Sequence, residues 1–285
     1  MKKLLLFLIC LPVIHCYSQD SNDDFTVIPE SSKPLEHLLN LFTIHGVPKN
    51  QRSDDTVNIL INHGYCVGFS KKYNQPVWAA YQVSKAKKDV DYERFPFFVD
   101  DRRLPSSNQI GNEGFGGGFD RGHMAPNAAI NRQFGKLSQM ETFIMSNICP
   151  QKGGLNRGVW QKLEAAILNK YCNTVKDSTH VWVLTGPIFS DHPDFITRSN
   201  GAKVAIPDSF YCILVRPATF PYENPTHAQY LSFIFSQNVP QSQALTTSFL
   251  VDINRVESRT GINFFPAFTT SNQNRIEPTV ATALW

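Results

Sequence analysis

Runs of apolar residues separated by polar turns predict a protein with more strands than helices. Residues 65–70 and 76–83 are rich in aromatic and β-branched side chains, and the polar residues 71–75 between them predict a β-hairpin. Further short apolar runs predict strands at residues 181–185, 204–206, 210–215 and 232–235. Short strands with few helices favour an α+β fold whose central sheet is mainly antiparallel and flanked by helices.

Two stretches begin with helical signals. Within residues 156–171 four apolar residues recur at helical spacing, and Asn156 is a residue type that favours the N-cap position. The four are Trp160, Leu163, Ile167 and Tyr171. Residues 251–260 begin like a second, short helix. The chain between 84 and 119 is irregular and ends in the glycine-rich segment 114–118, which predicts a flexible or tightly turned loop.

The N-terminal residues have the pattern of a targeting segment. Lys2 and Lys3 precede the apolar run 4–14, and the small residues Cys16 and Ser18 precede a cut after Ser18. This pattern predicts a secretory signal peptide over residues 1–18. The alternatives are a membrane anchor, for which the run falls short of about 20 residues, and a lipid anchor at Cys16.

The rest of the chain divides into two predicted parts. Residues 19–54 are polar and acidic at first and predict an exposed N-terminal arm, and residues 55–285 predict a single domain without a Ser-, Gly- or Pro-rich linker. A length of 285 residues with 42% hydrophobic and 18% charged residues excludes intrinsic disorder, collagen and a simple coiled coil. No later run is long and apolar enough to cross a membrane.

Charge is distributed unevenly along the chain. Residues 19–70 hold three basic and seven acidic side chains, whereas residues 121–176 hold eight basic and two acidic ones. A basic segment suits a polyanionic partner such as nucleic acid. The alternative is an ordinary solvated face, because the formal net charge of the whole chain is only +3.

The cysteines bear on the cellular compartment. Four remain after the predicted signal peptide is removed: Cys66, Cys149, Cys172 and Cys212. An even number in an exported chain predicts disulfides, and four cysteines allow three pairings. The predicted location is therefore secreted or periplasmic. The sequence contains no CxxC pair and no HExxH motif, so the usual zinc signatures are absent.

The candidate functional residues concentrate in two neighbouring blocks. The first, residues 120–127, contains Arg121, which can grip phosphate with two hydrogen bonds, and His123, which titrates near neutral pH. In the second, Asn156 and Glu164 are eight residues apart, about 80° around a helix, so they can address one site. From spacing alone, structural roles are the favoured explanation of these residues. His123 is then a structural histidine, Asn156 a helix cap, Glu164 part of a solvated helix face, and Asn147 a turn residue.

Taken together, these blocks resemble the endonuclease G-like DNA/RNA non-specific endonucleases, also called ββα-metal or His-Me finger nucleases. The family motif Asp-Arg-Gly-His matches Asp120 to His123, and two further blocks match residues 146–151 and 155–164. Other similar pieces lie at residues 184–189, 206–211 and 260–266. The resemblance covers roughly residues 55–275. Several ordered blocks at matching spacing are far more specific than one tetrapeptide.

The resemblance implies a ββα-metal fold and a hydrolase that cleaves the phosphodiester bonds of DNA and RNA through contacts to the phosphate backbone. It implies that His123 is the general base that activates water. Asn156 is the implied direct ligand of Mg²⁺ or Mn²⁺, and Glu164 would hold metal-bound water. The implied products carry 5′-phosphates, and a homodimer is expected because family members are often dimers.

The same resemblance assigns supporting roles to four other residues. Arg121 and Arg94 would stabilise charge on the reacting phosphate, and Arg94 is matched through the phenylalanines and acidic residue that follow it in 95–100. Asn147 would support the site through hydrogen bonds, and Asp120 would be structural. Arg157 follows Asn156 where relatives often carry a neutral polar residue.

Two rival functions belong to other classes. A catalytically silent module that binds a polyanion or a protein would be expected to have lost the base or the metal ligand, but His123 and Asn156 are both present. A metallohydrolase acting on small molecules would be expected to carry a cluster of histidines and aspartates, and the sequence shows none.

Overall fold

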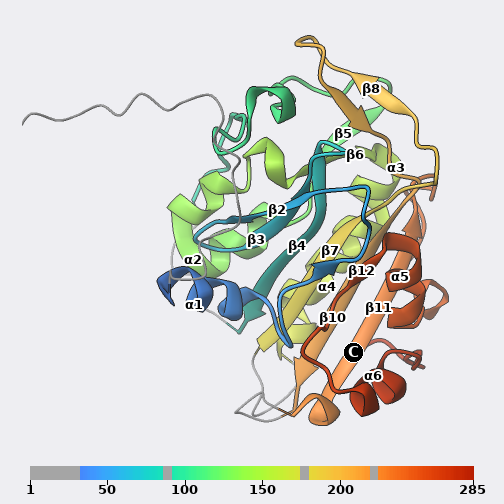
Figure 1. Cartoon of the computed structure of the whole chain (residues 1–285). Coiled ribbons are helices and arrows are strands. Elements are labelled where there is room, and N and C mark those ends of the chain that lie inside the picture. Colours follow the sequence, from blue (N-terminus) through green and yellow to red (C-terminus); the bar gives the residue numbers. More distant parts are fainter. Residues whose placement is uncertain (1–32, 86–91, 174–179, 219–223) are drawn as a thin grey trace, which may run out of the picture.

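A six-stranded antiparallel sheet forms the centre of the protein (Figure 1). The computed structural model describes residues 33–85, 92–173, 180–218 and 224–285, so the predicted signal peptide lies outside the described residues. The strand order is β11 (Ala228–Ser236), β10 (Ser209–Pro217), β7 (His180–Ile188), β4 (Gln75–Ser84), β3 (Cys66–Ser70) and β2 (Val57–Ile61). Each adjacent pair is antiparallel, which confirms the predicted sheet and the predicted hairpin of β3 and β4.

Both faces of the sheet are covered, so its inner strands are apolar at nearly every position. On β10, Phe210, Cys212 and Leu214 enter one core cluster, while Tyr211, Ile213 and Val215 enter the other. Side chains of α1 (Lys33–Phe42), α5 (Ile253–Thr260) and α6 (Thr270–Ile276) join the second cluster. Side chains of α2 (Asn127–Glu141) and α4 (Gln161–Asn169) join the first, so these helices cover the opposite face.

The prediction of an exposed arm over residues 19–54 is corrected for residues 33–54. Leu39 and Phe42 of α1 are buried in the core, and β1 (Lys49–Asn50) pairs with β12 (Ile262–Asn263) near the other end of the chain. This part of the arm therefore packs on the domain through Leu39, Phe42 and β1, because its apolar stretch needs a surface to cover. Residues 19–32 lie outside the described residues.

The sequence blocks that resemble the nuclease family fold into a strand pair followed by a helix. β5 (Phe119–His123) pairs antiparallel with β6 (Ile148–Lys152), with His123 opposite Ile148. The chain then forms α3 (Gly153–Leu155), a π-helical turn η3 (Asn156–Trp160) and α4. Three glycines with positive φ, Gly116 to Gly118, turn the chain tightly into β5, as the glycine-rich loop predicted.

The helix predicted at residues 156–171 begins three residues earlier, at Gly153, and its α-helical part ends at Asn169. Asn156 is therefore not an N-cap: its φ of −57° and ψ of −49° are helical, and its side chain caps no backbone N–H. The N-cap expectation was wrong because two glycines, Gly153 and Gly154, obscure the true start of the helix. The second predicted helix is α5, which Asp252 caps by accepting a 2.6 Å bond from the backbone N–H of Arg255.

The remaining elements are short. They are η1 (Ser106–Asn108), η2 (Met145–Asn147), η4 (Tyr171–Asn173), the pair β8 (Phe195–Thr197) and β9 (Lys203–Ala205), η5 (Pro225–His227) and η6 (Thr247–Phe249). Among the described residues, no helix has the length and apolar character needed to cross a bilayer.

The disulfide prediction is wrong for all four cysteines that it named. Cys66, Cys149, Cys172 and Cys212 are buried free thiols. Burial raises the pKa of each thiol, so none is a ready thiolate at neutral pH. They behave as small apolar side chains of the core, which accounts for them without a disulfide.

Candidate active site

A cleft of about 430 Å³ opens beside the β5–β6 pair. Its lining includes five of the six predicted site residues: Arg94, Arg121, His123, Asn156 and Glu164. Arg94 comes from the segment between β4 and β5, and Arg121 and His123 come from β5. Asn156 and Glu164 come from the helical stretch that follows β6. The strand pair and helix thus bring together residues that are up to 70 positions apart in the sequence.

His123 stands between two aromatic rings at the edge of this cleft. Its ring centroid lies 5.6 Å from that of Phe98 and 5.1 Å from that of Phe143. Burial, and then the positive charges of Arg94 and Arg121, lower the pKa of His123 to about 3. Nε2 is buried and has no hydrogen-bond partner among the described residues. The imidazole is therefore neutral at pH 7 and able to accept a proton.

The two arginines stack on the same two rings. The guanidinium of Arg121 lies 3.9 Å from the centroid of the Phe98 ring, and that of Arg94 lies 5.1 Å from the centroid of Phe143. Arg121 is fixed further by a 2.8 Å hydrogen bond from Nη1 to the carbonyl of Asn112. Stacking of this kind orients a guanidinium while leaving its N–H groups free to bind an anion. No pattern in the sequence indicated that Phe143 belongs to the site.

Asn147 lies outside the cleft and holds the chain that leaves His123. It is fully buried, and its Oδ1 accepts a 2.8 Å bond from the backbone N–H of Ala125. Its Nδ2 donates to the carbonyls of Ala125 (2.9 Å) and Thr142 (3.0 Å). The backbone carbonyl of Asn147 also accepts a 3.0 Å bond from the N–H of Met124. Asn147 is therefore placed to fix the position of His123 without contacting a ligand.

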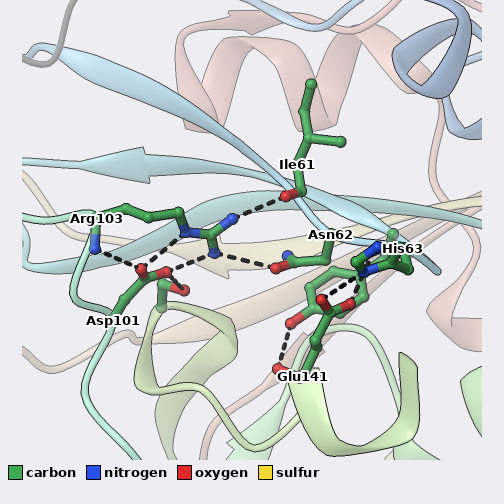
Figure 2. Close-up of polar contacts among 8 residues, drawn as sticks. Ile61, Asn62, His63, Asp101, Arg103 and Glu141 are labelled. Atoms are coloured by element: carbon green, nitrogen blue, oxygen red, sulfur yellow. Dashed lines mark hydrogen bonds and ion pairs between the residues drawn. The ribbon is translucent and has the colours of Figure 1, made fainter. Parts of the chain in front are cut away.

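Asp101 and Arg103 form the centre of a polar network (Figure 2) that includes Ser146, the residue before Asn147. The neighbouring Ser146 donates a 2.6 Å hydrogen bond to the buried carboxylate of Asp101, which forms a 2.7 Å ion pair with Arg103. Arg103 in turn donates to the carbonyl of Ile61 (2.8 Å) and to the side-chain oxygen of Asn62 (3.0 Å). These contacts tie the end of β2 to the loop before the site. They join residues 42 and 45 positions apart, a relation that no short motif encodes.

Asn156 is held in one orientation by Asp120. Its Nδ2 donates a 3.0 Å hydrogen bond to Oδ2 of Asp120, and Nε of Arg157 lies 3.1 Å from the same oxygen. Because a carboxylate only accepts hydrogen bonds, the amide nitrogen must face Asp120. The amide oxygen is then the end of Asn156 that can bind a metal ion.

Glu164 is the fifth predicted site residue that lines the cleft. Burial raises the pKa of Glu164 to about 8, with the Trp160 indole acting in the opposite direction, so without a nearby cation this carboxyl is largely protonated at pH 7. A divalent cation in the cleft would favour the carboxylate. Among the described residues, no group of three or more His, Cys, Asp and Glu side chains is arranged to hold a metal. One amide oxygen, one carboxylate and water suit Mg²⁺, which prefers oxygen ligands and retains water.

Comparison with curated proteins finds nucleases. The mouse (Mus musculus) mitochondrial nuclease EXOG is 28% identical over 225 residues, which cover 74% of this chain and 58% of the relative. Human EXOG is 27% identical, covering 71% of this chain and 55% of the relative. The mitochondrial nuclease of Saccharomyces cerevisiae is 28% identical, covering 68% and 61%. The chain thus spans between about half and three fifths of the length of these three relatives.

Comparison with solved structures supports the fold. A crystal structure of the EndoG/EndoGI complex superposes with a TM-score of 0.60 at 22% identity and covers 85% of this chain and 95% of that one. This likeness confirms the predicted α+β, ββα-metal nuclease fold.

The prediction of a secreted or periplasmic protein is contradicted. The three relatives are named mitochondrial nucleases rather than exported ones. The argument for export also used the cysteine count, and the four thiols are unpaired in the structure. A basic start followed by a short apolar run was too little to identify the compartment.

The family comparison covers the complete candidate site. The model of the DNA/RNA non-specific endonucleases matches residues 46–271, which is more than half of the chain. All six predicted site residues fall within this range, as do β5, β6 and the helical stretch after them. The chain therefore belongs to the DNA/RNA non-specific endonuclease family.

Proposed function

We propose that the protein is a metal-dependent endonuclease that hydrolyses phosphodiester bonds of both DNA and RNA and leaves 5′-phosphates. The observation that carries the proposal is the state of His123. It is a neutral imidazole with an unpaired nitrogen, beside two ring-stacked arginines and in the same cleft as Asn156 and Glu164. Few structural roles require such an arrangement.

Substrate binding falls to the arginines. Arg94 and Arg121 line the cleft and present guanidinium groups that suit the oxygens of a phosphodiester. Contacts to the phosphate carry no base information, so recognition at this point is the same for every sequence. It is also the same for deoxyribose and ribose.

Proton transfer falls to His123. The neutral ring accepts a proton from a water molecule as the water oxygen attacks phosphorus. The positive charges of Arg94 and Arg121 hold the pKa of His123 low in the free protein. A bound phosphate offsets those charges, so the ring becomes a stronger base once substrate is in place.

Asn156 and Glu164 are the residues that would hold Mg²⁺ or Mn²⁺, Asn156 directly and Glu164 through a water molecule. When bound, the ion supplies stabilisation of negative charge on the departing oxygen. Asp120 keeps the amide oxygen of Asn156 available by accepting from its nitrogen. Without a cation the carboxyl of Glu164 is largely protonated at pH 7, which couples its ionisation to metal binding.

The test is digestion of plasmid DNA and total RNA with Mg²⁺, with EDTA, and by His123→Ala. We expect degradation of both substrates, loss of activity in EDTA, and a reduction of at least about 100-fold in the variant. The exposed His192 provides a matched control, His192→Ala, which should cleave normally. A folded protein that cleaves neither substrate with any divalent metal would be a silent binding module instead. Cleavage that survives His123→Ala would assign the general base elsewhere.

Two finer expectations are part of the proposal. We propose residues 55–285 as the nuclease domain, with residues 33–54 packed on it through α1 and β1. We also keep the homodimer as a prediction from the family. Light scattering during gel filtration tests it, because a monomer mass at micromolar concentration would contradict it.

A further inference from the structure

A second cleft, of about 490 Å³, adjoins the active-site cleft. The two share Arg94, Asn127, Ala128 and Leu168, and the second is lined in addition by Tyr92, Glu93, Asn131, Arg132 and Gln139. Arg94 thus stands on the boundary between them. A chain molecule with its phosphate in the first cleft would place the neighbouring part of the chain in the second.

The wall of the second cleft carries an unusual number of unpaired polar atoms. Oδ1 of Asn127, Oδ1 of Asn131, Nε of Arg132 and Oε1 of Gln139 are buried, and none has a hydrogen-bond partner among the described residues. Asn131 is only 9% exposed and Gln139 only 1%. Unpaired buried polar groups are unfavourable, so four beside one cleft indicate a place that a polar partner completes.

The chemistry of these atoms argues against a second phosphate site. Nε2 of Gln139 donates to the carbonyl of Tyr92 at 3.4 Å, which leaves its oxygen as the unpaired end. Three of the four unpaired atoms are amide oxygens, which accept hydrogen bonds, and phosphate oxygens accept as well. The edge of a nucleobase offers both N–H donors and acceptors, which is the complement that amide side chains require.

The segment between β4 and β5 also supplies an aromatic surface. The ring of Tyr92 is 39% exposed and lines the second cleft. Two residues further on, Arg94 marks the boundary between the clefts, and Phe98 lies against Arg121 and His123, which line the first cleft. A base that has left its stack gains a new stacking partner on such a ring.

We propose that the second cleft binds the nucleobase next to the cleaved phosphate, stacked near Tyr92 and with its polar edge toward the amides of Asn127 and Asn131. This inference rests on the proposed nuclease function and narrows its substrate class. A base can enter the cleft only when it is unpaired, so single-stranded or locally opened nucleic acid is the preferred substrate.

The test uses an end-labelled single-stranded 20-mer in which one nucleotide near the middle is abasic. Cutting at the two linkages beside the abasic position is compared with cutting of the same linkages in the intact oligonucleotide, and distant linkages serve as the internal reference. We expect the wild type to cut one of the two flanking linkages roughly tenfold less when the base is missing, the loss typical of one stacked base. Cutting at distant linkages should not change.

Tyr92→Ala should cut the intact oligonucleotide roughly tenfold less efficiently and should no longer distinguish it from the abasic one. Phe97→Ala is the matched control, because Phe97 is 65% exposed on the same segment but lines neither cleft. This control should behave as the wild type. A loss of the same size in Phe97→Ala would mean that any exposed ring on this segment has the effect, and would overturn the proposal.

Asn131→Leu separates binding from structure. If the amide serves a ligand, its replacement raises KM for single-stranded DNA while the melting temperature stays the same or rises, because a buried amide oxygen without a partner among the described residues is removed. A lower melting temperature with an unchanged KM would assign Asn131 to the fold and overturn its part in the proposal.

Two results distinguish failure of this inference from failure of the nuclease function. If the wild type cuts beside the abasic position as well as elsewhere, the second cleft holds only water and the inference is wrong while the nuclease function stands. If the wild type cuts no linkage of any oligonucleotide with Mg²⁺ or Mn²⁺, the proposed function itself is wrong.

Discussion

Among the described residues, two histidines have strongly lowered pKa values, and only one of them lines the active-site cleft. Burial lowers the pKa of His45 to about 4, and burial together with two arginines lowers that of His123 to about 3. Both stand among aromatic rings, His45 with centroid distances of 4.8 Å to Phe268 and 5.8 Å to Phe265. By pKa and by neighbours, the two are nearly alike.

They differ in their nitrogens and in their charges. Nε2 of His45 lies 3.2 Å from the hydroxyl of Tyr230, whereas Nε2 of His123 has no partner among the described residues. No cation contributes to the shift at His45, whereas Arg94 and Arg121 contribute at His123. A lowered pKa therefore does not by itself mark a catalytic histidine. An unsatisfied nitrogen beside fixed cations in an open cleft is the more specific signal.

The largest expected effect is on catalysis and separates the two histidines completely. His123→Ala should lower kcat/KM for plasmid DNA by about 10²–10⁴-fold, because it removes the general base. His45→Ala should leave kcat/KM within about twofold, since it lies outside both clefts. A comparable loss in His45→Ala, with the fold intact by circular dichroism, would break the comparison.

A smaller effect on stability and activity is expected where the chain leaves His123. Asn147→Ala removes the partners of Ala125 and Thr142 and should lower the free energy of unfolding by about 3 kcal/mol, measured in urea. Cleavage by the folded fraction should fall as well, because His123 loses its fixed position. The exposed Asn254 on α5 gives the control Asn254→Ala, expected to change stability by less than about 0.5 kcal/mol. Equal effects at the two positions would show that Asn147 has no special role.

The third prediction concerns the pH dependence of cleavage. Because the pKa of His123 is depressed, the ring stays neutral as pH falls through 6.5, and the acid limb of kcat/KM should lie below pH 6. Arg121→Ala removes a cation that disfavours the imidazolium, so the limb should move to higher pH, with a loss of about tenfold in kcat/KM near pH 7. An acid limb that does not move in Arg121→Ala would remove this arginine from the electrostatics of His123.

The smallest expected effect is on the pH dependence of stability. A histidine with a depressed folded pKa stabilises the protein above its unfolded pKa of about 6.5, and this contribution is lost as pH falls toward 4. His45→Asn, chosen because asparagine tolerates the positive φ of 62° at this position, should flatten the decline between pH 6.5 and 4 by about 1 kcal/mol. Urea titrations at several pH values measure this, and parallel declines in both proteins would contradict it.

The sequence predicted the parts whose signal is local. The β3–β4 hairpin, the strands of the sheet and the helix containing Trp160 and Leu163 follow from residues close together in the chain. It did not predict α2, whose pattern is interrupted by Gly135 with a φ of 80°. The disulfide prediction was wrong because it assumed that the protein is exported. A cysteine count indicates disulfides only in an oxidising compartment. The N-cap at Asn156 was wrong because glycine conceals where a helix begins.

The candidate site, too, was predicted only in part from the sequence. The family motifs located the residues that line the cleft, but their catalytic roles remain predictions. Phe143 is distant in sequence from Phe98, and only the fold places both rings against His123. The unpaired amides of the second cleft were equally invisible, because an asparagine without a partner differs from one with a partner only in three dimensions.

The four buried thiols give the protein its own set of reporters. Each lies in a different element: Cys66 on β3, Cys149 on β6, Cys172 on η4 and Cys212 on β10. A thiol in the core reacts with an alkylating reagent only when its element opens, so pulsed alkylation followed by mass spectrometry ranks the elements by how often they open. Faster labelling of Cys149 than of Cys212 would show that the β5–β6 strands separate from the central sheet during normal thermal motion, without any probe having to be engineered.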